Sequence, residues 1–149
     1  MSHTFTNLLT HVIFSTKDRE PLITAALHDD LLAYLGGIVR EVGGVLRASN
    51  ARSDHVHLLC SLPPTAATAD ALRLVKTNSS RWVHGSRDYP GFDWQTGYGA
   101  FSVSQSQAPA VVQYIADQEK HHHRVTFQEE FIAILKKHGI AYDERYIWS

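Results

Sequence analysis

The chain has 149 residues, which is enough for one domain with a sizeable hydrophobic core, and we expect residues 1–149 to form a single domain. Hydrophobic residues make up 44% and charged residues 19% of it, a balance that excludes a disordered or fibrous protein. No run reaches membrane-spanning length and nothing resembles a signal peptide, so a cytoplasmic location is expected.

Charge is distributed unevenly along the chain. The formal net charge of −1 gives no general sign of a nucleic-acid partner. Between Arg40 and Arg87, however, seven basic residues stand against three acidic ones, so this third of the chain carries +4. Such a bias indicates either a polyanion partner or an ordinary solvated surface.

The first part of the chain alternates strand and helix patterns. The β-branched and apolar run from Leu8 to Thr16 predicts a first strand. A helix is predicted to begin after Thr24, a typical N-cap residue, and to end at Gly43-Gly44. Two strands are predicted next, over Val45–Ala51 and Asp54–Leu62.

A second helix is predicted from about Ala69 to His84, with Leu72, Val75, Trp82 and Val83 facing inward, and a fourth strand over Gly99–Ser104. The order of elements is then β-α-β-β-α-β. This order is typical of the α+β, ferredoxin-like (RRM-like) fold, an antiparallel four-stranded sheet with both helices on one face.

Two further helices are predicted beyond this core. Pro109 suits the first turn of a helix that runs to about His123. Thr126 and Glu129 form the pattern of a capping box for the last helix, which ends at Gly139. The tail YDERYIWS is rich in aromatic residues, so we expect it to pack against the domain.

The strand over Asp54–Leu62 carries two histidines among apolar residues. Because side chains alternate across a strand, Val56, Leu58 and Cys60 share the face toward the helices, and the single cysteine is expected to be a small core residue. His55 and His57 share the opposite, open face. Two neighbouring imidazoles form half of a metal site, or they are two polar residues on an exposed sheet face.

Tyr114 and Gln118 are candidates to complete such a site. They are four residues apart in the predicted helix that starts near Pro109, so they are neighbours on one helical face. If that helix covers the open sheet face, Gln118 can join the metal shell and bring Tyr114 beside it. An activated phenol can form a covalent intermediate, although Tyr114 can equally be a packing aromatic residue.

The sequence resembles a known family along nearly its whole length. The motifs are DHVHLL followed by a proline pair, LVKTNSSRW, WQTGYGAFSVS, YIADQEKHH and TFQEEF, in this order between about His11 and Gly139. Together they resemble the single-tyrosine HUH transposases, which include the REP-associated tyrosine transposases and their IS200-like insertion-sequence relatives.

This resemblance implies a nickase and strand-transferase for single-stranded DNA. It implies that His55 and His57 are the metal-binding pair, that Gln118 is the third ligand, and that Tyr114 is the nucleophile that keeps the DNA 5′ end as a phosphotyrosine. The implied ion is Mg2+ or Mn2+, although two imidazoles and an amide are softer ligands than magnesium prefers. No nucleotide cofactor is expected, because the phosphotyrosine bond retains the energy.

The implied partners are DNA hairpins from palindromic ends or repeats, and a second copy of the chain. In such homodimers the protomers join through their sheets, and the tyrosine helix of one can complete the site of the other. Whether sites form within or between chains stays open, as do the DNA target and a mobile-element or host role. Residues of the second predicted helix are expected to contact hairpin backbone: Arg73, Lys76, Ser80 and Arg81.

Other interpretations remain for several residues. His121, His122 and His123 are expected to be helix-end residues favoured by the helix dipole rather than ligands. His11 is expected in the core or on the sheet face rather than at a metal. The alternative functions are an RRM-like module that binds nucleic acid without cutting it, and a metal-dependent hydrolase without covalent tyrosine chemistry.

Overall fold

The computed structural model describes residues 3–122 and 124–148. Its centre is a four-stranded antiparallel sheet in the order β2-β3-β1-β4. The strands are β1 (Leu9–Ser15), β2 (Val45–Ala51), β3 (His55–Ser61) and β4 (Gly99–Ser102). The predicted ferredoxin-like arrangement is confirmed, and the histidine strand β3 is an inner strand between β1 and β2.

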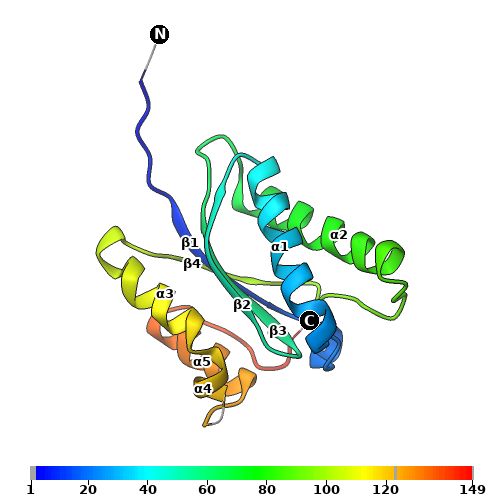
Figure 1. The fold of residues 1–149 in the computed structure, drawn as a ribbon. Helices are drawn as coiled ribbons and strands as arrows, with labels where there is room; N and C mark the ends of the chain where they lie inside the picture. The colour runs from blue at the N-terminus through cyan, green and yellow to red at the C-terminus, as the bar shows by residue number, and fades with distance from the viewer. Residues whose placement is uncertain (1–2, 123, 149) are drawn as a thin grey trace.

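One face of the sheet packs against α1 (Ala25–Glu41) and α2 (Thr68–Ser86), as Figure 1 shows. The Thr24 hydroxyl caps α1 by accepting a hydrogen bond from the backbone N–H of Leu27 at 3.2 Å. Gly43 follows α1 at φ 91°, a conformation that favours glycine. The predicted inward residues of this layer are buried in one cluster with the helices, among them Val56, Leu58, Cys60, Leu72, Val75 and Val83.

The other face of the sheet is covered by α3 (Ala108–Ala116), α4 (Gln118–His122) and α5 (Phe127–Lys137). The prediction of one helix from Pro109 to about His123 is wrong, because Asp117 adopts φ −90° and ψ 18° and separates α3 from α4. Its N–H still bonds to the Gln113 carbonyl, and its own carbonyl accepts from His121, so the chain changes direction between two helical segments. His123 lies outside the described residues.

The C-terminal segment follows its prediction closely. Thr126 and Glu129 form the capping box of α5, and Gly139 ends the helix region at φ 67°. Tyr142, Ile147 and Trp148 of the tail pack against the aromatic residues of α5. The tail and α5 therefore cover the part of the sheet face that α3 and α4 leave open. Within the described ranges, no helix is long and apolar enough to cross a membrane.

Candidate active site

The histidine pair of β3 lies beneath the helices α3 to α5. His55 and His57 share one face of the strand, as predicted, but they are only 1% and 0% exposed. The alternative of two polar residues on an exposed sheet face is therefore wrong. Buried imidazoles need polar partners, so the contacts of these two rings define the site.

A carboxylate that the sequence analysis did not select lies at the centre of the site. Glu130 of α5 is 2% exposed. Its Oε1 lies 3.0 Å from His57 Nε2, 3.1 Å from His122 Nε2 and 3.5 Å from His55 Nε2. The four side chains place one ligand atom each within 4.8 Å of one another.

This group suits a divalent cation. Within the described part of the chain, His55 Nε2 is buried without a hydrogen-bond partner, so a lone pair of that atom can face an ion. Three imidazole nitrogens are typical ligands of zinc and other transition metals, and a carboxylate oxygen adds the harder donor that manganese and magnesium prefer. The donor set therefore fits a metal ion, with manganese between the two preferences.

Tyr114 and Gln118 reach the same carboxylate from the other side. The Tyr114 hydroxyl donates a short hydrogen bond to Glu130 Oε2, and His121 Nε2 lies 3.4 Å from both oxygens. Gln118 is fully buried, its amide nitrogen 3.3 Å from Glu130 Oε2 and its amide oxygen 3.0 Å from His122 Nε2. Although the helix breaks at Asp117, the two predicted residues are thus brought together with the histidine pair.

Burial and the Glu130 charge set the protonation of the site. Burial alone would raise the pKa of Glu130, but hydrogen bonds with His122, His55 and His57 lower it well below its usual range, so the carboxylate is ionised. Burial and this negative charge together raise the pKa of Tyr114 above its usual value. The phenol consequently stays protonated while its hydrogen bond to Glu130 is in place.

Each histidine of the pair is anchored through its second nitrogen. Burial opposes charge on His55, but hydrogen bonds with Asp54, at 2.7 Å from Nδ1, and Glu130 raise its pKa. Burial lowers the pKa of His57, whose Nδ1 lies 2.9 Å from Nε2 of His11. His11 is itself buried, as expected, and burial followed by the proximity of His57 lowers its pKa to about 3. His11 is therefore neutral at physiological pH.

Glu130 and His122 are the residues that sequence reasoning missed at this site. His122 does lie at the end of α4, as expected of a helix-end residue, but its Nε2 also faces the group. Glu130 had a detectable signal, since it falls on the same helical face as the apolar residues Phe127 and Phe131. An acidic residue on the buried stripe of a helix requires a partner, which here is the histidine group.

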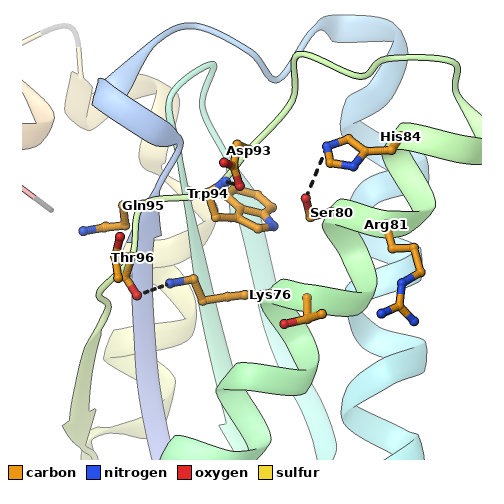
Figure 2. A pocket seen from close by; sticks show the side chains of 9 residues that line it. Lys76, Ser80, Arg81, His84, Asp93, Trp94, Gln95 and Thr96 are labelled. Carbon is orange, nitrogen blue, oxygen red and sulfur yellow. Dashed lines mark hydrogen bonds between the residues drawn. The ribbon is translucent and has the colours of Figure 1, made fainter.

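The residues expected to contact DNA occupy α2, on the opposite face of the sheet. Lys76, Ser80 and Arg81 line a cavity of about 520 Å³ between α2 and the segment of residues 93–96 (Figure 2). Arg73 is exposed on α2 but does not belong to the lining.

Lys76 is held within the protein rather than pointing freely into solvent. Its Nζ donates to the carbonyl oxygens of Thr96 at 2.9 Å and Gly97 at 2.7 Å. Burial lowers its pKa to about 8, partly offset by Asp93. The first role of Lys76 is therefore to tie α2 to the segment before β4, and this distinguishes it from the exposed Arg73 and Arg81.

Comparisons with known proteins agree with this architecture. The family model described as "Transposase IS200 like" matches residues 4–118. A candidate transposase of known structure from Deinococcus radiodurans R1 is 26% identical, with a TM-score of 0.62 over 79% of this chain and 95% of that one. A REP-associated tyrosine transposase, solved bound to a REP hairpin, is 17% identical, with a TM-score of 0.59 over 84% and 76% of the two chains. Comparison with curated protein sequences gives no match.

The fold and the site together define an α+β protein with a ferredoxin-like sheet, a buried histidine and glutamate group suited to a metal ion, and a tyrosine beside it. The family match covers most of the chain. The protein belongs to the IS200-like transposase family.

Proposed function

We propose that this protein cuts and rejoins single-stranded DNA through a covalent bond to Tyr114. The observation that carries the proposal is the shared carboxylate: one oxygen of Glu130 faces the histidine group, and the other accepts the hydrogen bond of the Tyr114 hydroxyl. A nucleophile and a metal-type centre are thus linked through one residue. The family membership supplies the class of reaction, DNA cleavage with strand transfer.

His55 and His57 would hold the ion, with Gln118 as the third ligand and Glu130 and His122 as further donors. A bound Mn2+ or Mg2+ would polarise the scissile phosphate and stabilise the charge that develops on it. The burial of these side chains keeps bulk water away from the reacting groups. We propose no nucleotide cofactor, since the covalent intermediate conserves the energy of the cleaved bond.

The chemical step belongs to Tyr114. Its phenolic oxygen forms a bond to phosphorus while the bond from phosphorus to the 3′ oxygen breaks. The phenolic proton passes to the Glu130 carboxylate that already accepts its hydrogen bond, and the departing 3′ oxygen takes a proton from water. The products are a 5′-phosphotyrosine and a free 3′-hydroxyl, and attack by a 3′-hydroxyl in the reverse direction joins strands.

For the substrate, we propose DNA hairpins that flank the cleavage site. Support comes from the fold shared with the hairpin-bound REP-associated transposase, and from the basic α2 surface. Arg73, Arg81 and Ser80 would contact phosphates, while Lys76 would hold the cavity wall in place. Binding should weaken as salt concentration rises, because phosphate contacts release counterions.

The test is a labelled hairpin oligonucleotide from the protein's own locus, incubated with Mn2+ and the wild type, Tyr114→Phe or His57→Ala. Wild type should give a protein–DNA adduct that survives denaturation, whereas both variants should bind the hairpin without forming it. Cleavage by both wild type and Tyr114→Phe without any adduct would favour the hydrolase. Binding without cleavage by any form would favour a nucleic-acid-binding module.

A further inference from the structure

His11 lies beside the histidine pair but contributes no atom to the metal-type group. It belongs to β1, where the neighbouring Ile13 pairs with His57 of β3, so the His11 and His57 side chains occupy the same face of the sheet. Their ring centroids are 5.2 Å apart with an interplanar angle of 30°. His11 Nε2 lies 2.9 Å from His57 Nδ1, and His11 is only 6% exposed. The contact is thus a buried, directed one rather than general packing.

The two nitrogens of His57 have different surroundings. Nε2 faces Glu130 Oε1 and the other ligand atoms of the group, while Nδ1 faces His11. A neutral imidazole carries its proton on one nitrogen only. If Nε2 is to offer its lone pair to a cation, the proton must sit on Nδ1, and a buried N–H there requires an acceptor. His11 Nε2 is in the position to be that acceptor.

We propose that His11 is a positioning residue, which accepts the Nδ1–H of His57 and so directs the lone pair of His57 Nε2 at the metal-type centre. This inference rests on the proposed metal site. Outer partners of metal-bound histidines are usually carboxylates, backbone carbonyls or water, and Asp54 fills that role for His55. The pair is therefore held by one charged acceptor and one neutral acceptor.

A role in packing alone makes a different prediction. The His11 ring also lies near Phe101 and Tyr114, with centroids 6.5 and 6.2 Å away. A phenyl ring at position 11 would fill nearly the same space but would offer no acceptor to His57. A glutamine would lose the ring but retain an amide oxygen that can accept the same hydrogen bond. These two substitutions separate shape from hydrogen bonding.

The experiment is calorimetric titration of Mn2+ into the DNA-free wild type and the variants His11→Phe, His11→Gln and His57→Ala. His11→Phe should weaken Mn2+ binding by about 10- to 100-fold, the usual effect of removing an outer partner of a ligand. His11→Gln should recover most of the affinity. His138→Phe is the matched control, because His138 stacks on Phe101 at 4.7 Å without a printed contact to His57, and it should bind Mn2+ like the wild type.

The outcomes separate this proposal from the metal site itself. If wild type binds no Mn2+, or if His57→Ala binds it equally well, the proposed metal site is wrong. If His57→Ala loses binding while His11→Phe retains wild-type affinity, only the role of His11 is overturned. Should His11→Phe fail to fold, ring 15N spectra of wild type loaded with Cd2+ decide. A proton on His57 Nδ1 with the ion on Nε2 supports the proposal, and the reverse assignment contradicts it.

Discussion

Glu130 is the residue on which the chemistry of this site depends. It is a buried anion surrounded by His55, His57 and His122, and it also accepts the Tyr114 hydrogen bond. A buried charge is costly unless it is paired, and here the pairing links the tyrosine to the histidines. One carboxylate thereby connects the nucleophile to the residues that would hold the ion.

Replacing Glu130 by glutamine keeps the shape of the side chain and removes its charge. We expect Glu130→Gln to lower Mn2+ affinity at least about tenfold and to lower the rate of adduct formation, because a ligand and a proton acceptor are lost together. Hairpin binding should be unchanged, since α2 lies on the other sheet face. Calorimetry and the adduct assay measure these quantities.

The neighbouring Glu129 provides the control for this substitution. Glu129→Gln removes the same charge from α5 but keeps the capping box, which accepts either residue. Equal Mn2+ affinity in wild type and Glu130→Gln would contradict a role of Glu130 at the metal.

Lys76 predicts a pH dependence of stability. Its pKa falls from 10.5 to about 8 in the folded protein, chiefly through burial. Between these values the unfolded chain keeps a proton that the folded chain has released, so the free energy of unfolding should rise with pH across this window. The neutral amine still has two N–H groups for the carbonyls of Thr96 and Gly97.

The measurement is denaturant unfolding of wild type and Lys76→Met between pH 7.5 and 10.5, which brackets the window set by the Lys76 pKa. The difference in unfolding free energy, wild type minus variant, should increase with pH. A difference that stays level or decreases would show that the pKa of Lys76 is not lowered by folding.

At the scale of elements, α5 connects fold stability to the site. Its aromatic residues Phe127 and Phe131 pack with Phe101 of β4 and with the tail, and Phe127 also stacks on His55 at 4.3 Å between centroids. The same helix presents Glu130 to the histidines. Loosening the start of α5 should therefore affect the metal-type centre as well as the stability of the protein.

The cap residue Thr126 tests this connection, with Thr24 of α1 as the matched control. Each hydroxyl accepts a hydrogen bond from a backbone N–H three residues later at 3.2 Å. Either Thr→Ala substitution should cost about 1 kcal/mol of stability, or a decrease of about 2–4 °C in Tm. Only Thr126→Ala should also weaken Mn2+ binding, and equal Mn2+ affinities in the two variants would contradict the coupling.

The sequence predicted local elements better than their meeting points. The Thr24 cap, the strand over Val45–Ala51 and the Thr126 capping box depend on neighbouring residues, and all are confirmed. The break at Asp117 could not be predicted, because no proline or glycine marks it and the cause is the way α4 turns toward Glu130. His55, His57, Tyr114 and Gln118 do meet, whereas Glu130 was missed because its partners are distant in sequence.

At the scale of the whole molecule, the two sheet faces have separate tasks. The layer of α1 and α2 forms the main core and presents the basic surface, while α3 to α5 enclose the histidines (Figure 1). Tyr114 lies beside His57 of the same chain, with ring centroids 5.8 Å apart. A complete constellation therefore forms within one chain, whatever the oligomeric state, although we retain the homodimer as a proposal.

This geometry predicts the result of a complementation test. Mixing His57→Ala with Tyr114→Phe should restore no adduct formation, because each chain supplies its own tyrosine to its own histidines. Native mass spectrometry would establish whether mixed dimers are present in the sample. Recovered activity would show that the tyrosine helix exchanges between protomers.

The central claim is that Tyr114 becomes covalently bound to DNA. After reaction of wild type with a hairpin oligonucleotide and Mn2+, nuclease and protease digestion followed by tandem mass spectrometry locates the nucleotide remnant on the chain. The account predicts a phosphate-linked nucleotide on Tyr114. A remnant on another tyrosine such as Tyr98, or cleaved DNA with no modified peptide, would contradict it.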